Sequence, residues 1–340
     1  MNKDTETATA ACVLGLALAL AGLVSACGSR QPPAPPKPLT TEDRIKWYQA
    51  CWSDFNEKKW DDFKKCYAPG ATSQQIGYGR PYVTGPAEIV AASQDFEKSL
   101  PDVRGEGQLI LINANHIAGI YLLKGTNTGV IFLPDNTQIY GTNKKIGLLF
   151  GHVIEIDPIE TKVVKEIGVI DGVTFENQLG LLKLSGQSLM ETGAVTPTIV
   201  IAKNDDTEMK NLEASKAWIE IWNKHDPAVF NVLASDVVIH NNTLPKDMNK
   251  TDTVNSDKGV WKSFSDSKMT ASSMWAAGDY VVIAGTADGT NDGDLISIKK
   301  KTGKKVSIPF IEIDRLQDEK IKEAWFFMDN ANFISQLGVK

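Results

Sequence analysis

The feature that most constrains this chain is an internal repeat. Residues 165–180 and 322–338 both begin with Lys-Glu, run through apolar residues to an Asp, and end in Gln-Leu-Gly. A second pair agrees with the first, because Gly-Thr-Asn-Thr-Gly at 125–129 recurs as Gly-Thr-Asn-Asp-Gly at 289–293. Several matches at nearly one spacing indicate duplication of a structural unit. The sequence therefore predicts two copies of one domain.

The chain of 340 residues is long enough for both copies to bury a core of their own. We place domain 1 at 41–183 and domain 2 at 207–340. The segment between them, 184–206, lacks the landmarks of the repeat and contains Gly, Pro and an Asn-Asp-Asp run, so it is predicted to be a linker. Its apolar run at 199–201 could add an edge strand to a sheet.

Each copy starts with helical periodicity and continues with strands. Apolar residues from Ile45 to Phe55 and from Leu212 to Trp222 recur at helical spacing, and a further helix is expected at 86–100 and at 255–264. Runs of β-forming residues follow at 108–112, 116–123, 129–132, 145–150 and 163–170, and at 269–276, 280–285, 295–299, 305–313 and 320–328. This order predicts the α+β class, with helices packed on one face of a curved antiparallel sheet.

The N-terminus has the pattern of a targeting segment. Residues from Ala8 to Ala26 carry no charge and are rich in Ala, Leu, Val and Gly, which is typical of a secretory signal peptide. Cys27 follows small residues, and this stretch resembles the lipobox of bacterial lipoproteins. The resemblance implies a signal peptide at 1–26, a lipidated Cys27 bearing acyl chains such as palmitate, and a Pro-rich tether at 27–40.

We therefore expect a lipid-anchored protein of the bacterial cell envelope, attached to the membrane through Cys27. Gly28 rather than Asp after the cysteine fits sorting to the outer membrane, if the host is Gram-negative. The alternative is an uncleaved membrane anchor, because Lys3 is offset by Asp4 and Glu6 and the start is less positive than a typical signal peptide.

The remaining cysteines leave two states open. Cys51 and Cys66 can form a disulfide in an oxidising envelope, or they can stay as two buried thiols. Neither has a His at short spacing, so no metal and no other cofactor is expected. A formal net charge of −6 gives no basic surface, so nucleic acid is not an expected partner.

The second copy carries most of a pattern known from one family. The pattern consists of Trp222-Asn223, Asp226, Asp236 to His240, Gly278-Asp279, Gly289 to Gly293, Thr302-Gly303, Glu323, Trp325, Asp329 and Gln336 to Gly338. In these residues the chain resembles the SnoaL-like polyketide cyclases, within the nuclear-transport-factor-two-like superfamily of cone-shaped α+β domains. The resemblance implies two cone-shaped domains in tandem, which would pair through their sheets as a pseudo-dimer within the chain.

The resemblance also implies an apolar cavity that contains a general acid/base. Asp329 occupies the position of the family's catalytic aspartate, and a dry pocket would raise the pKa of such a carboxyl toward neutrality. His240 would orient the substrate or stabilise enolate charge. The cavity would be lined by Trp222, Asn223, Trp325, Phe327 and Asn291.

Domain 1 departs from this pattern and is expected to be degenerate. Asn replaces the family's His in the Gly-Thr-His-x-Gly motif of both copies, at Asn127 and Asn291. The spacing from Glu to Asp at the end of the repeat is one residue shorter in domain 1, and a one-residue change swaps the face of a strand. Any chemistry is therefore expected in domain 2.

Each candidate residue also has a structural interpretation. Asp329 could cap the helix expected at 330–337, since Asp is strongly preferred at that position. His240 stands beside two Asn residues and could belong to a surface turn. The other three histidines, His116, His152 and His225, are interpreted as structural residues.

Three functional hypotheses follow from these patterns. The first is a lipid-anchored protein that binds an apolar small molecule, mainly in domain 2, because one copy has lost key features of the family. The second is a cyclase-like or isomerase-like enzyme in which Asp329 moves a proton next to a carbonyl. The third is a protein–protein interaction module that uses the open faces of the sheets.

Overall fold

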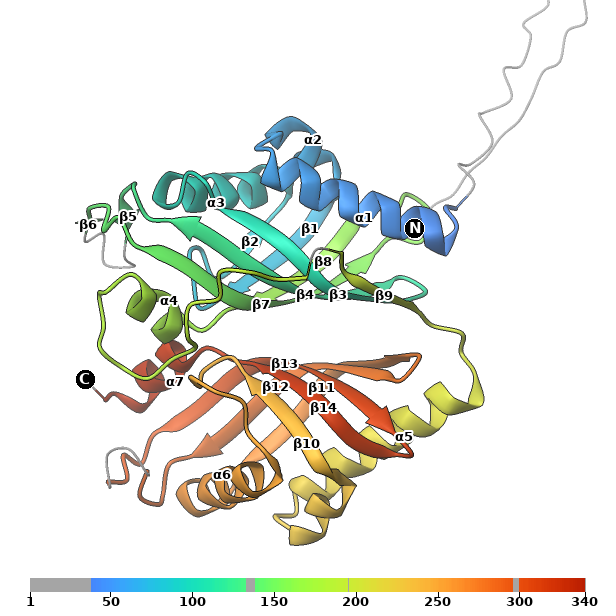
Figure 1. The fold of residues 1–340 in the computed structure, drawn as a ribbon, viewed down its shortest axis with the longest axis vertical. Helices are drawn as coiled ribbons and strands as arrows, with labels where there is room; N and C mark the ends of the chain where they lie inside the picture. Colours follow the sequence, from blue (N-terminus) through green and yellow to red (C-terminus); the bar gives the residue numbers. More distant parts are fainter. Residues whose placement is uncertain (1–37, 133–137, 195, 296–299, 340) are drawn as a thin grey trace, which may run out of the picture. The chain divides into compact units, whose positions relative to one another are not determined.

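The computed structural model describes residues 38–132, 138–194, 196–295 and 300–339. They contain two large sheets, each with helices on one face (Figure 1), which confirms the predicted α+β class. The signal peptide, Cys27 and most of the Pro-rich tether lie outside the described residues. So does most of the strand expected at 295–299.

Domain 1 begins with the helices that its apolar periodicity predicts. Its elements are α1 (Thr41–Asn56), α2 (Trp60–Lys65), β1 (Tyr67–Ile76), β2 (Val83–Thr84), α3 (Pro86–Ser99), β3 (Arg104–Asn113), β4 (His116–Thr126), β5 (Ile131–Phe132), β6 (Gln138–Ile139), β7 (Lys145–Ile156), β8 (Val163–Val169) and α4 (Gly172–Gln178). α1 starts where the Thr40 side chain accepts a hydrogen bond from the Asp43 amide. Side chains three and four positions apart then face the core: Ile45, Tyr48, Cys51 and Phe55.

Domain 2 repeats this order. Its elements are α5 (Asp206–Trp222), η1 (Pro227–Val232), β10 (Leu233–Asn241), α6 (Lys250–Ser263), β11 (Lys268–Ala277), β12 (Tyr280–Thr290), β13 (Lys305–Gln317), β14 (Lys320–Phe327) and α7 (Asn330–Leu337). A capping box of Asn249 and Asp252 starts α6. The helix therefore begins at Lys250, before the predicted 255, because the cap and not the apolar periodicity sets its first turn.

The strands form a seven-stranded and a five-stranded sheet. Their orders are β2-β1-β8-β7-β4-β3-β9 and β10-β14-β13-β12-β11. The meanders are antiparallel as predicted, whereas β1 and β10 run parallel to β8 and β14. These first strands are separated from the meander by a helix, so no hairpin forces antiparallel pairing. β9 (Thr198–Ile201), in the linker, adds the expected edge strand beside β3.

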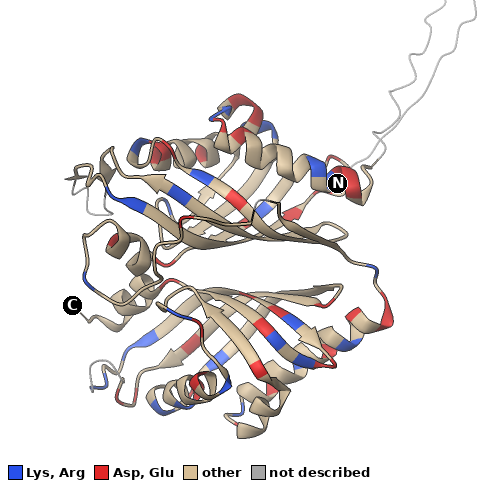
Figure 2. Ribbon diagram, in the orientation of Figure 1, with Lys and Arg blue, Asp and Glu red and all other residues tan. Residues whose placement is uncertain are grey.

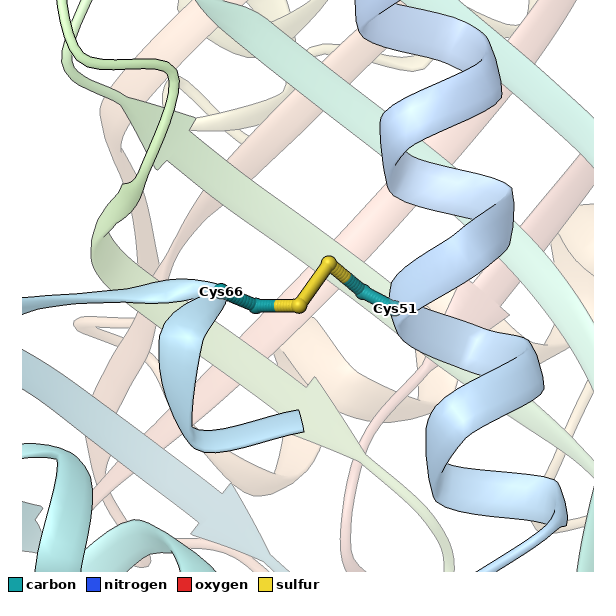
Figure 3. The surroundings of a disulfide bond; sticks show 2 residues. All are labelled: Cys51 and Cys66. Atoms are coloured by element: carbon teal, nitrogen blue, oxygen red, sulfur yellow. A yellow bond between two sulfur atoms is a disulfide. The ribbon is translucent and has the colours of Figure 1, made fainter. Parts of the chain in front are cut away.

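A disulfide joins Cys51 in α1 to Cys66 at the end of α2 (Figure 3). Of the two states that the sequence left open, the structure shows the cross-link. The two cysteines are 15 positions apart, and chain-entropy arguments give about 3 kcal/mol of stabilisation for a loop of that size. The bond thus holds α1 to the start of β1.

The helix-free faces of the two sheets pack on each other. One apolar cluster draws buried side chains from both domains, among them Leu111, Ile120, Val153 and Val169 of domain 1 and Val282, Ile311, Ile313 and Phe327 of domain 2. The Asn113 side chain of β3 also donates a hydrogen bond to the Ala276 carbonyl of β11, at 2.8 Å. Each sheet therefore has both faces buried, one by helices and one by the other sheet.

Charged residues of both signs are interspersed over the two domains. Figure 2 shows Lys and Arg interspersed with Asp and Glu on the helices and strands of both domains. In the part of the chain that the structure describes, no helix combines the length and the apolar composition that a bilayer crossing requires.

Candidate functional site

Domain 2 encloses a cavity of about 350 Å³ between its helices and the inner face of its sheet. This volume falls within the range of small-molecule pockets, about 300–1,000 Å³. The wall is mainly apolar, and its aromatic members are Trp218, Trp222, Phe264, Phe310, Phe326 and Phe333. Trp222, one of the proposed lining residues, thus lies in the cavity wall.

Besides Asp288 of β12, three carboxyl groups line this cavity or adjoin it. Asp257 of α6 and Glu312 of β13 belong to the wall, and Asp314 lies two residues beyond Glu312 on the same face of the strand. Glu312 is 6% exposed and Asp314 is 0% exposed. Among the described residues, no group outside this pair donates a hydrogen bond to Glu312 Oε2 or to either carboxyl oxygen of Asp314. The cavity therefore combines apolar walls with a pair of buried acids.

Burial changes the protonation of all three acids. It raises the pKa of Asp257 to about 7, against an opposing effect of the Trp222 side chain, and it raises the pKa of Asp314 to about 7. The pKa of Glu312 rises well above its usual value, first through burial and then through the charges of Asp314 and Asp257. Groups that titrate near neutral pH in a pocket are candidates for ligand binding or proton transfer.

Asp329, the residue proposed as catalytic base, lies outside this cavity. Alternate residues at the end of β14 and beyond point into the cavity: Ala324, Phe326 and Met328. Position 329 therefore faces the other way. The Asp329 carboxylate accepts hydrogen bonds from the Ala331 and Asn332 amides of α7, at 3.0 and 3.2 Å. The catalytic assignment is thus corrected to that of a helix cap.

Asp329 and its counterpart Asp171 each reach into the other domain. Asp329 Oδ1 accepts a hydrogen bond from the Gly172 amide at 3.0 Å, and Asp171 Oδ1 accepts one from the Asn330 amide at 2.8 Å. Asp171 also caps its own helix, α4, through the Thr174 amide at 2.9 Å. Burial raises the pKa of both carboxyls. The paired aspartates therefore link the two helices that end the repeats.

His240 and Trp325 also lie on the opposite side of the sheet from the cavity. Ile239 lines the cavity, and adjacent strand residues face opposite sides, so His240 points away from it. His240 Nδ1 is 2.8 Å from an Asp247 carboxyl oxygen and Nε2 is 3.1 Å from one of Glu323. Its ring stacks on Trp325 with centroids 5.1 Å apart. The assignment of His240 as the catalytic partner of Asp329 is corrected, and Trp325 does not line the cavity.

Phe327 and Asn223 hold structural positions rather than places in the cavity wall. Phe327 is 1% exposed in the cluster between the two sheets, where a side chain at Gly151 of domain 1 would collide with its ring. Asn223 donates a hydrogen bond to the Met269 carbonyl and accepts one from the Met269 amide, at 2.9 and 2.7 Å. It therefore fastens the end of α5 to the start of β11.

Asn291 shows why the Gly-Thr-Asn-x-Gly motif recurs. Its side-chain amide donates to the Ser263 and Gly293 carbonyls at 3.1 and 2.9 Å, and its Oδ1 accepts from the Thr302 amide at 2.6 Å. Asn127 makes the equivalent three hydrogen bonds in domain 1. Both side chains are 0% exposed, so their loss would leave buried backbone groups unpaired. Asn291 is thus a loop-fixing residue and not a lining residue.

Domain 1 holds a smaller cavity of about 110 Å³ with a chain of polar side chains in its wall. Glu166 Oε1 is 2.7 Å from His152 Nε2, and His152 Nδ1 is 2.7 Å from the Tyr48 hydroxyl. Because a carboxylate only accepts, the imidazole donates its Nε2 proton to Glu166. Its Nδ1 accepts the Tyr48 proton when the ring is neutral and donates to the hydroxyl oxygen when the ring is protonated. All three side chains are buried.

The Glu166 carboxyl stays acidic although it is buried. Burial alone would raise its pKa, but the hydrogen bond and charge of His152, with further contributions from Ser73 and Tyr67, hold the pKa below its usual value. Burial raises the pKa of the Tyr48 hydroxyl. A carboxylate, an imidazole and a phenol in one line can hold a proton or pass it to a bound molecule.

The structure places His152 in a hydrogen-bonded chain in the wall of the domain 1 cavity, which the sequence did not indicate. His152 pairs with Gly168 across β7 and β8, so it meets Glu166 only through the sheet register. Strand pairing also makes Ala324, and not Glu323, the domain 2 counterpart of Glu166. The linear spacing of His152 and Glu166 carries no sign of this contact.

Comparison with known proteins identifies the second domain. Residues 212–337 match the family model described as SnoaL-like polyketide cyclase. Among solved structures, AclR from Streptomyces galilaeus is 23% identical over 38% of this chain and 86% of its own, with a TM-score of 0.36. IdmH from Streptomyces antibioticus is 22% identical over 38% and 99%, with a TM-score of 0.34. TsrD from Streptomyces laurentii is 19% identical over 41% and 100%, with a TM-score of 0.36.

No curated protein matches the chain. At identities of this size, the similarity to solved structures concerns the fold and does not extend to substrates. What the domain binds has to be argued from its own cavity.

Proposed function

We propose that this protein binds a small and mainly apolar molecule in domain 2. Residues 212–337 of this domain belong to the SnoaL-like polyketide cyclase family. The observation that carries the proposal is the cavity of about 350 Å³ with aromatic walls. Burying apolar ligand surface there contributes roughly 25 cal/mol per Å². The sheet faces that an interaction module would use already cover each other, which favours the cavity as the binding surface.

Filling the cavity tests this proposal. Ala287 lines the cavity, so Ala287→Phe would place a ring inside it. We expect native mass spectrometry of the full chain to detect one bound small molecule, and the variant to retain roughly tenfold less of it, because apolar contact area is lost. Ala271→Phe is the matched control, since Ala271 lies exposed on β11. Equal occupancy in both variants would place the ligand elsewhere.

We also propose that a lipid on Cys27 holds the protein at the bacterial cell envelope, at the outer membrane if the host is Gram-negative. The support is the uncharged segment up to Ala26, followed directly by cysteine and a Pro-rich stretch. Cys27→Ser is expected to move most of the protein from the membrane pellet to the soluble fraction, because the acyl chains supply the attachment. If the variant stays in the pellet, an uncleaved anchor is the better explanation.

A second candidate function is proton transfer in domain 1. The observation that favours it is the buried chain of Glu166, His152 and Tyr48 in a cavity wall. Glu166 fixes the orientation of the His152 imidazole. The imidazole or the Tyr48 hydroxyl can then exchange a proton with the carbon next to a carbonyl group of a bound molecule. A cavity of about 110 Å³ admits a small substrate or one end of a larger one.

Deuterium exchange into a small ketone such as butanone, followed by NMR in deuterium oxide, tests the second candidate. We expect the protein to accelerate exchange, and His152→Gln to reduce the acceleration on the order of 10²-fold, which is the usual contribution of one acid/base group. His116→Gln is the matched control, because His116 stands at the start of β4 and outside the cavity wall. Equal rates with and without the protein would remove this candidate.

A further inference from the structure

The buried carboxyl groups at the domain 2 cavity have no positively charged side chain beside them among the described residues. Glu312 lines the cavity and is 94% buried, since 6% of it is exposed, yet its Oε2 has no partner among the described residues. Asp314 lies behind it on the same strand face and is 0% exposed, and among the described residues its hydrogen-bonding neighbour is the Glu312 carboxyl. Asp257 faces them from α6. Buried carboxyl groups are costly unless a donor or a positive charge compensates them.

The other charged groups of the cavity wall do not supply that compensation. They are Lys268 of β11 and Asp288 of β12. Lys268 is exposed to solvent, and it makes no contact that satisfies Glu312 Oε2. The α5, β10 and β14 segments contribute no charged side chain to the wall. The Glu312 and Asp314 carboxyls can share a proton with each other, but a positive charge beside them would have to come from a bound molecule.

The surroundings of the acids favour an organic ligand over a metal ion. Within the described residues, no group of three or more His, Cys, Asp or Glu side chains is arranged to hold a metal. The cavity of about 350 Å³ is also far larger than an ion needs, and most of its wall is apolar. Phe310 precedes Glu312 by two residues on the same strand face, so a cation at the acids would also lie near an aromatic ring.

We propose that the ligand of the domain 2 cavity is an amphipathic amine, whose ammonium group pairs with the Glu312 carboxyl while its apolar body packs against the aromatic wall. This inference rests on the proposed function, because it names the chemical class of the molecule bound there. Ammonium donates up to three hydrogen bonds, and Glu312 is a buried acid of the cavity wall that can accept one. Charge-assisted hydrogen bonds of this kind are stronger than neutral ones.

Amine binding would depend on pH in a defined direction. Burial raises the pKa of Asp257 and of Asp314 to about 7 and that of Glu312 well above its usual range. An ammonium ion binds best when at least one of these groups is ionised, so affinity should fall as the pH is lowered through 7. Lys268 and Asp288 are the remaining charged residues of the cavity wall.

Naphthylethylamine and naphthylethanol form a suitable pair of probes, because they share an apolar body and differ in charge. With the full chain at about pH 8, calorimetry should give about tenfold tighter binding of the amine than of the alcohol. The Glu312→Gln/Asp314→Asn double variant should lose that preference and still bind the alcohol, which shows that its cavity is intact. Glu220→Gln, on the exposed side of α5, is the control for removal of one acid.

The outcomes separate the two proposals. If amine and alcohol bind equally, or if the double variant keeps the amine preference, the inference about amines is overturned while the cavity remains a binding site. If neither probe binds and Ala287→Phe changes nothing in the native mass spectrum, the proposed function itself is contradicted. Loss of the amine preference in the double variant, with retained alcohol binding, supports both.

Discussion

Replacing Glu312 with Gln and Asp314 with Asn is expected to stabilise the protein at about pH 8, by on the order of 3 kcal/mol in free energy of unfolding. Burial raises the pKa of Asp314 to about 7 and that of Glu312 well above its usual value, whereas the unfolded chain ionises both near pH 4. The folded state thus holds more protons between about pH 4 and 7, and its stability falls as the pH rises through that window.

Amide side chains carry no ionisation penalty, so the stability of the double variant should change less with pH. Urea denaturation at about pH 5 and pH 8 measures the difference. Some slope is expected to remain, because burial also raises the pKa of Asp257, Asp171 and Asp329. Glu220→Gln should leave the slope unchanged. An unaltered slope in the double variant would mean that both acids are already ionised and solvated in the folded protein.

Asp329→Ala is expected to lower the free energy of unfolding by about 3 kcal/mol. The variant loses the cap of α7, a loss of about 1 kcal/mol. It also leaves the Gly172 amide of domain 1 without its acceptor, and a buried donor without a partner costs about 1–3 kcal/mol. Denaturation in urea, compared with Asp171→Ala as the matching change in the other copy, provides the measurement.

Asp329→Asn separates the structural role from a catalytic one. An Asn side chain keeps one acceptor oxygen for the amides of Gly172 and α7, so the loss of stability should be smaller than with Ala. Ligand occupancy in the native mass spectrum should remain that of the wild type. If the Asn variant folds normally but loses its bound molecule or any turnover, Asp329 would have to be reassigned from a helix cap to a ligand-binding or catalytic residue.

The repeat, the helices and the strands could be predicted because each leaves a local mark. Helical periodicity, caps and turn residues are properties of neighbours in sequence, and the Gly-Thr-Asn motif is retained in both copies because Asn127 and Asn291 fix the same loop. The parallel pairing of β1 and β10 leaves no such mark, since it depends on where the chain returns after a helix.

The candidate site could be predicted only in part, because each sheet is buried on both faces. In β13, Ile311 and Ile313 alternate with Glu312 and Asp314, and the usual rule would place the apolar pair in the core and the acids in water. Here the isoleucines lie between the two sheets, and the acids lie on the cavity side of the strand, with Glu312 in the cavity wall. Alternation shows that the two faces of a strand differ, but it cannot show which face packs between the two sheets and which lies under the helices at the cavity.

The pairing of the two sheets within one chain has a consequence for how the cavities could diverge. In a dimer of identical subunits, every substitution in one cavity is repeated in the other, and both must tolerate it. Joining the copies by the linker makes the pairing intramolecular and independent of concentration. It also allows the residues of each cavity to be substituted independently. His152 of β7 therefore occupies the strand position that Glu312 of β13 holds in the other copy.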